Sequence, residues 1–149
     1  MKKPFLLKLL IFLVLFQGVS GLLGGIPLTF WPSGNVLGTP LSMLENTPFN
    51  NFLIPGLFLL IVLGFFPLIL GYTMIVEPKW KLPNKLNIYE NFNNLWAYSM
   101  YIGLILILWI LIEIYLVGGG HVLQFIFGLL GTLIVIVALS PQVMDYYKK

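Results

Sequence analysis

A chain of 149 residues that is 59% hydrophobic and only 9% charged cannot cover a water-facing surface, because soluble domains carry about 25% charged residues. The composition predicts one integral membrane domain, residues 1–149, whose partner is the lipid bilayer. The net charge of +3 comes from lysine alone. The lysines stand at the ends of apolar runs, which favours contact with anionic lipid headgroups and excludes nucleic acid as the partner. With no cysteine and one histidine, disulfides, thiolate metal sites and histidine-rich metal centres are excluded as well.

Residues 4–25 form the first apolar run, interrupted only by Lys8 and Gln17. Its length matches the roughly 20 apolar residues that a membrane-spanning helix needs, and Lys8 lies close enough to the near interface to reach water. The same segment resembles a cleaved signal peptide, with lysines before an apolar stretch and small residues at 18–20. Because the apolar character continues through Ile26, the length favours a retained helix, and cleavage stays open as the alternative.

Residues 26–50 form a loop of mixed polarity on the outer side of the predicted membrane. Thr39-Pro40 is a typical helix start, so we expect a very short helix through Leu41–Leu44, lying in the membrane interface. Thr47-Pro48 repeats this signal and opens the second span, residues 49–76.

The second span contains Gly64, Pro67 and Gly71 on one helical face. Pro67 has no N–H to donate to the carbonyl of Leu63, so we expect a kink near the middle. Close packing of this face against a neighbouring helix is the favoured interpretation. The alternative is a hinge, or an exposed carbonyl that lines a cavity.

Residues 77–95 are the most polar segment, and an asparagine run near its end predicts a helix start. The third and fourth spans follow at 95–117 and 122–139. The predicted fold is therefore all-α, with four transmembrane helices in an antiparallel bundle. Both termini and the 77–95 loop then share one side with all eight lysines, which places that side in the cytoplasm. These lysines are Lys2, Lys3, Lys8, Lys79, Lys81, Lys85, Lys148 and Lys149.

Motifs for nucleotide binding, metalloprotease chemistry, calcium binding and a serine triad are missing from the sequence. We therefore expect no catalytic residue, no metal site and no cofactor. One polar cluster remains. Glu113 and Gln124 flank the turn Gly118–Gly120 at similar distances along the chain, which puts both about 8 Å below the apex of a helical hairpin.

Two further polar residues fit this cluster. Gln17 shares a helical face with small residues of the first span, and Gln124 shares one with small residues of the last, so both should face other helices. His121 in the turn could cap the resulting pocket. The packing residues expected from these stripes and from the second span are Gly21, Gly25, Gly64, Gly71, Gly128 and Gly131.

The cluster of Glu113, Gln124, Gln17 and His121 has two interpretations. A carboxylate in hydrocarbon is costly unless it is partnered, protonated or hydrated, so Glu113 could form a site that responds to protons or cations, or binds a small polar ligand. In the structural interpretation, which we favour, Glu113 lies among headgroups or bonds Gln124 as a helix–helix contact.

The loop from Gly24 to Gly56, with Gly-Gly-Ile-Pro-Leu at its start and Thr-Pro-Leu-Ser-Met-Leu-Glu-Asn-Thr-Pro further on, resembles a group of small uncharacterised bacterial membrane proteins with four spans. The resemblance implies a bacterial inner membrane and no particular activity. Together these features favour a non-enzymatic accessory or interaction subunit, which packs through its glycine stripes with a larger membrane protein or with itself. The alternative is a small transport or sensing protein that uses Glu113.

Overall fold

The computed structural model describes residues 2–149, and the long elements within them are all helices. No β-strand occurs in this range, where only Phe92 and Lys148 form an isolated bridge. The predicted all-α class is thus confirmed. The helices are α1 (Phe5–Phe30), the 3-10 turn η1 (Leu41–Leu44), α2 (Leu53–Leu60), the π-helical turn η2 (Ile61–Phe65), α3 (Phe66–Val76), α4 (Asn94–Val117), α5 (Val122–Ala138) and α6 (Pro141–Tyr147).

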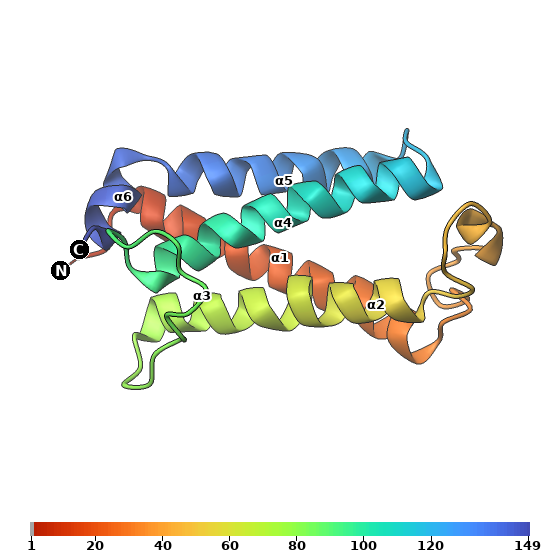
Figure 1. Ribbon diagram of the computed structural model, residues 1–149, viewed down its shortest axis with the longest axis horizontal. Coiled ribbons are helices and arrows are strands. Elements are labelled where there is room, and N and C mark those ends of the chain that lie inside the picture. The colour runs from red at the N-terminus through yellow and green to blue at the C-terminus, as the bar shows by residue number, and fades with distance from the viewer. Residues whose placement is uncertain (1) are drawn as a thin grey trace.

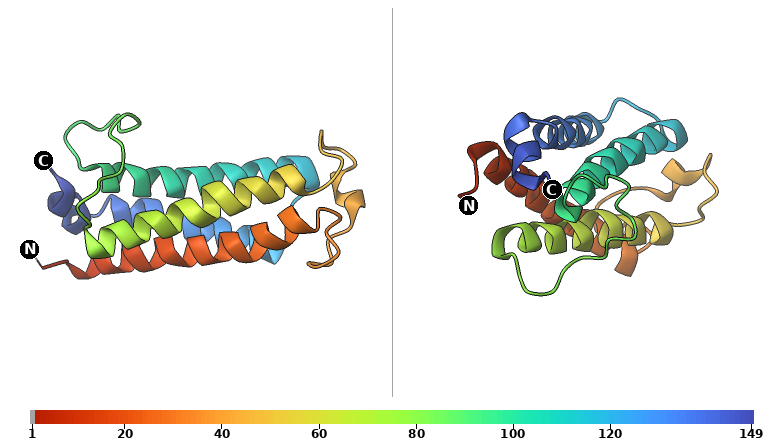
Figure 2. Two further views of the ribbon diagram at one scale, coloured as in Figure 1. Left: turned by 90° about the horizontal axis from the view of Figure 1, so that it is seen from below. Right: turned by 60° about the vertical axis from the view of Figure 1, so that its left-hand side comes forward.

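The long helices lie beside one another along the long axis of the molecule (Figure 1). α1 runs away from the end that holds the N-terminus, and α2, η2 and α3 return as one line of helix. α4 and α5 then form a second pair. Both termini, α6 and the loop between α3 and α4 gather at one end, whereas the loop between α1 and α2 lies at the other (Figure 2). The segments that carry the eight lysines therefore meet at one end, which we call the lysine end.

Three lines of helix within the described residues are long and apolar enough to cross a membrane, namely α1, Leu53–Val76 and α4. α5 has 17 residues, a length of about 25 Å, which falls short of a hydrocarbon core of about 30 Å. It becomes a fourth candidate when it is counted together with α6, from which it is bent by 61°. The prediction of several helices that are long and apolar enough to span a membrane is confirmed.

α1 continues beyond its predicted end at residue 25. It includes Pro27 and ends at Phe30, where the N–H of Trp31 donates to the Pro27 carbonyl at 2.9 Å and closes the last turn. The short helix expected in the following loop is the single turn η1, with Pro40 at its N-cap position.

α2 begins at Leu53, later than the predicted start at residue 49. Thr47 does not cap a helix, because its hydroxyl donates to the Leu44 carbonyl at 2.8 Å and accepts from the N–H of Phe49 at 3.2 Å. This turn bends the chain away from helical geometry. The side chain of Asn51 then accepts the N–H of Leu53 at 3.0 Å, which is where the helix starts.

The missing donor of Pro67 is accommodated by the π-helical turn η2, which directly precedes α3. Because Pro67 has no N–H, the carbonyl of Leu63 lacks its usual partner four residues later in the chain. The side-chain amide of Gln17 on α1 donates to this carbonyl at 3.1 Å. The proline on one helix and the glutamine on another are therefore two parts of one interaction.

Glycines let the backbones of α1 and the α2–α3 line approach closely. A Cβ added to Gly21 would collide with the carbonyl of Leu63, and one added to Gly25 would lie 2.5 Å from the backbone nitrogen of Leu60. Gly64 faces the same contact from the other side. The structure thus places these three predicted packing glycines at a helix–helix contact, as is common between membrane helices.

α4 and α5 meet through a reciprocal glycine contact. A Cβ on Gly103 would lie 3.0 Å from the carbonyl oxygen of Gly131, and a Cβ on Gly131 would lie 3.0 Å from that of Gly103. Gly131 belongs to the predicted stripe, whereas Gly103 was not singled out in the sequence. Gly128 is less constrained, since its nearest neighbour, Ile110, would be 3.9 Å away. The indole N–H of Trp96 adds a hydrogen bond to the Ala138 carbonyl at 2.8 Å.

The two helix pairs are joined by a continuous apolar core. Its buried side chains come from α1, η2, α3, α4, α5 and α6. Those completely shielded from solvent include Leu7, Leu10, Val14, Leu63, Leu70, Met74, Ile102, Ile134 and Val143.

Substitution of Gly21 tests the close approach of α1 to η2. Gly21→Ala is expected to lower stability by about 1–3 kcal/mol, because the new methyl group forces the two backbones apart. The measurement is the thermal unfolding midpoint in detergent. Gly24→Ala on the same helix is the matched control, since its Cβ would meet nothing closer than 3.7 Å. Equal effects of the two substitutions would contradict the proposed contact.

Candidate functional site

The four residues of the predicted polar cluster do not share one environment. Gln17 and Gln124 are buried, with 2% and 8% of their surface exposed, whereas Glu113 is half-buried and His121 is exposed. His121 occupies the N-cap position of α5, and its side chain makes no capping bond there. The cluster as a working site stays a prediction, and the bonds of each member indicate what that member does in the fold.

Gln124 holds the hairpin turn. Its side-chain amide donates to the carbonyl of Gly118 at 2.9 Å, and its Oε1 atom has no partner. Within residues 2–149 no hydrogen bond joins Gln124 to Glu113, so the helix–helix bond considered for this pair is not present. Glu113 forms no ion pair either, since the one ion pair among the described residues joins Lys3 to Glu77.

Gln17 has its partner elsewhere. Its amide donates to the Leu63 carbonyl, as described above, and its Oε1 atom is buried without a partner. The prediction that Gln17 faces a helix contact agrees with this geometry. The structure forms no hydrogen bond between Gln17 and the other three residues in the part of the chain that it describes.

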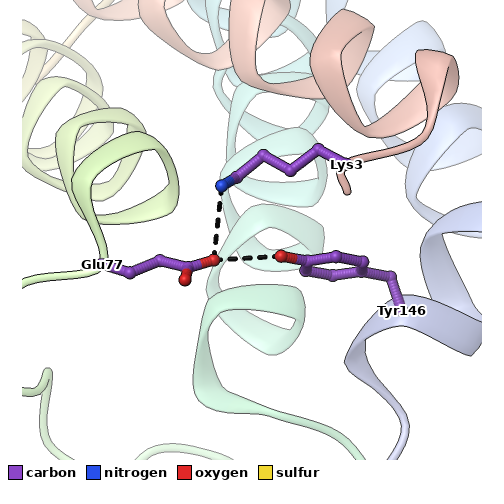
Figure 3. Close-up of polar contacts among 3 residues, drawn as sticks. All are labelled: Lys3, Glu77 and Tyr146. Atoms are coloured by element: carbon purple, nitrogen blue, oxygen red, sulfur yellow. Dashed lines mark hydrogen bonds and ion pairs between the residues drawn. The ribbon is translucent and has the colours of Figure 1, made fainter. Parts of the chain in front are cut away.

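A second polar cluster, which sequence reasoning missed, lies at the lysine end. Glu77 ends α3 in a left-handed conformation, with φ of 50°. Its carboxylate accepts a hydrogen bond from the Tyr146 hydroxyl at 3.0 Å and pairs with the ammonium of Lys3 at 3.4 Å (Figure 3). Three distant segments of the chain therefore converge on one carboxylate. A non-glycine residue in this conformation persists only where its surroundings hold it.

The loop between α3 and α4 is ordered by its asparagines. Asn94 donates to the Leu82 carbonyl at 3.1 Å and also to the side chain of Asn84, while Asn87 donates to Asn94 at 2.9 Å. Asn93 accepts the N–H of Leu95 at 2.9 Å and caps α4, so the helix start predicted from the asparagine run is confirmed.

The C-terminal segment is fastened to this loop. The backbone N–H of Asn93 donates to the Tyr147 carbonyl at 2.9 Å, and that of Lys149 donates to the Asn91 carbonyl at 2.8 Å. α6 lies beyond the apolar helices, and burial raises the pKa of both the Tyr146 and the Tyr147 phenols. Both side chains therefore remain protonated hydrogen-bond donors at neutral pH.

These segments enclose a cavity of about 600 Å³ at the lysine end. Its walls come from the end of α3, the loop, the start of α4 and the segment around α6. The lining is mixed: Glu77, Lys81, Asn84, Asn94, Tyr147 and Lys149 provide polar groups, and Trp80, Leu82 and Leu95 provide apolar ones. A pocket of this size is in the range of small-ligand sites.

A second depression is entirely apolar and lies between α2 and α4. It has a volume of about 460 Å³ and is lined on the α2 side by Ile54, Phe58 and Val62, among others, and on the α4 side by Ile105, Leu108, Trp109 and Ile112. We call it the α2–α4 groove. The rings of Phe58 and Trp109 stack across it with centroids 4.6 Å apart.

Within residues 2–149 no group of three histidine, aspartate or glutamate side chains lies close enough to hold a metal ion. Comparison with family models, with curated proteins and with solved structures finds no match for the chain.

The role of Gln17 is tested by a double-mutant cycle with Pro67. Gln17→Met removes the donor and nearly keeps the shape, and is expected to cost about 1 kcal/mol because the Leu63 carbonyl loses its partner. In the Pro67→Ala background the restored N–H can serve that carbonyl, so the cost of Gln17→Met should largely disappear. The readout is the unfolding free energy in detergent. An equal cost in both backgrounds would mean that Pro67 and Gln17 are independent.

Proposed function

We propose that the chain is a small, non-enzymatic integral membrane protein that acts as an interaction subunit for another membrane protein. In this proposal α1, the α2–α3 line, α4 and α5 are four spans of an antiparallel bundle in a bacterial inner membrane. The lysine end is cytoplasmic, by the distribution of the lysines, and η1 lies in the outer interface. The bacterial setting rests on the resemblance of the loop around Gly24–Gly56.

The α2–α4 groove is the observation that supports this function. Leu108 and Ile112 line it and remain exposed, with 57% and 50% of their surface accessible. Two aromatic side chains, Phe58 and Trp109, line it, and aromatic residues are enriched in protein interfaces. We infer that its occupant is one transmembrane helix of a partner, whose apolar side chains enter the groove.

Glu113 favours a helix over a lipid chain as this occupant. It follows Trp109 by one helical turn and therefore borders the groove on α4. Its carboxylate makes no hydrogen bond among the described residues, and a carboxylate at this depth is costly unless it is partnered. A partner helix can supply a lysine, arginine or hydroxyl donor there, whereas an acyl chain cannot.

A small transport or sensing protein is the second candidate, supported by Glu113, a half-buried carboxylate that needs a proton, water or a partner at this depth. It receives less support, because the amides of Gln17 and Gln124 are already bonded to backbone carbonyls. These amides stabilise the bundle and are not available to line an ion path.

Site-specific crosslinking tests the interaction subunit. A photoreactive phenylalanine at Leu108 in the groove should yield one discrete adduct with a different membrane protein in native membranes. The same probe at Ile136 on α5 should not, although that residue is exposed to almost the same extent, 58% against 57%. Glu113→Leu, which removes the carboxylate that borders the groove, should lower the adduct yield by about threefold to tenfold.

Three outcomes would contradict the proposal. Adducts with lipid alone would mean that acyl chains fill the groove, and covalent dimers of the chain would mean that a second copy occupies it. The same adduct at Ile136 and at Leu108 would indicate contact without a specific site. The unfolding midpoint of Glu113→Leu shows whether a lower yield reflects binding or loss of folded protein.

A further inference from the structure

The cavity at the lysine end is not used in the function proposed for the α2–α4 groove. We propose that it binds the phosphate-bearing headgroup of an anionic phospholipid. This proposal is independent of the interaction subunit, because the cavity and the α2–α4 groove have no lining residue in common.

Positive charge at the cavity is available to a ligand. The only ion pair among the described residues joins Lys3 to Glu77. Lys81 and Lys149 both line the cavity, both are exposed, and neither has a carboxylate partner there. Lys3 compensates the one acidic group in the wall, so the cavity attracts an anion. A lysine ammonium is a common ligand of phosphate.

A neutral donor in the wall lacks a partner. Tyr147 lines the cavity with only 4% of its surface exposed, and its hydroxyl has no hydrogen-bond partner. Buried polar groups are nearly always bonded in folded proteins. A hydroxyl left without a partner beside a polar cavity is explained when a bound acceptor, such as a phosphate oxygen, completes it.

The walls are fixed before any ligand enters. Asn94 holds the loop through the Leu82 carbonyl, and the backbone bond between Asn93 and Tyr147 ties α6 to it. A preformed site loses less conformational freedom on binding than a mobile one. These hydrogen bonds give the cavity a defined shape, which separate surface lysines that only attract a charged membrane do not have.

The location suits a lipid. The cavity opens at the end of the apolar helices, and its wall combines the polar groups with Trp80, Leu82 and Leu95. Tryptophan is typical of the membrane interface. A phospholipid would place its phosphate near the lysines and its glycerol against the apolar wall. A free anion would contact the lysines and leave the apolar wall unused.

The test measures binding of phosphatidylglycerol to the purified full chain in detergent by native mass spectrometry, with phosphatidylcholine as the neutral-headgroup comparison. One phosphatidylglycerol molecule should bind about tenfold more tightly than phosphatidylcholine. Lys81→Ala with Lys149→Ala should weaken this binding about tenfold. Lys85→Ala with Lys148→Ala is the matched control: it removes the same charge from exposed lysines that do not line the cavity, and affinity should be retained.

Tyr147→Phe provides a readout that a structural role would not give. Loss of the hydroxyl should weaken phosphatidylglycerol binding about tenfold, while the unfolding midpoint without lipid stays unchanged or rises, because no bond is lost. Equal losses in the two lysine pairs, or equal affinity for the two lipids, would overturn the proposal in favour of diffuse attraction. Glycerol 3-phosphate or inorganic phosphate binding as tightly as the lipid would assign the cavity to a free anion and overturn the lipid.

Discussion

The packing of the first half of the molecule depends on one backbone carbonyl. Pro67 deprives the Leu63 carbonyl of its helical donor, and in an apolar environment an unpaired carbonyl is costly. Gln17 on α1 supplies the missing hydrogen bond at 3.1 Å. The same bond is what makes a glutamine acceptable among apolar side chains. Gly21 lies one turn further along α1 and has no side chain to block the approach. Pro67, Gln17 and Gly21 therefore depend on one another. Pro67 leaves a carbonyl without a donor, Gln17 supplies the donor, and Gly21 lets the two helices come close enough for the bond to form.

The polar groups of the molecule differ in where they lie. Inside the bundle, Gln17 and Gln124 donate to backbone carbonyls and stabilise helix contacts. Their Oε1 atoms have no partner, and neither does the hydroxyl of Tyr147 in the cavity wall. Glu113 and the cavity differ from the two glutamines because they lie where another molecule can reach them. Interaction with other molecules is accordingly expected at the ends and in the groove rather than through the middle of the bundle.

The sequence predicted the helices well and their contacts only in part. Apolar runs locate α1, the α2–α3 line, α4 and α5 because the length and hydrophobicity of a span are properties of one segment. Glycine stripes likewise indicated the packing faces of Gly21 and Gly131. Pro67 marked the Leu63 carbonyl as lacking a helical donor, but its bond to Gln17 could not be predicted, because the sequence does not tell which residue of another helix lies opposite that carbonyl. Of the two structural alternatives for Glu113, the hydrogen bond to Gln124 is not present among the described residues, because the Gln124 amide donates to the carbonyl of Gly118.

The cluster around Glu77 could not be predicted from the sequence. Lys3, Glu77 and Tyr146 come from three segments, and nothing in their spacing brings them together. They meet because both helix pairs place their chain ends at one end of the bundle, so that a loop, a terminus and α6 must share a small area. The segments that carry the eight lysines also reach that end. A topology that gathers both termini beside a long loop therefore also builds a polar cavity lined by two lysines and one glutamate, Lys81, Lys149 and Glu77. The lipid binding proposed for this cavity depends on the order in which the chain connects its helices, and not on a local sequence motif.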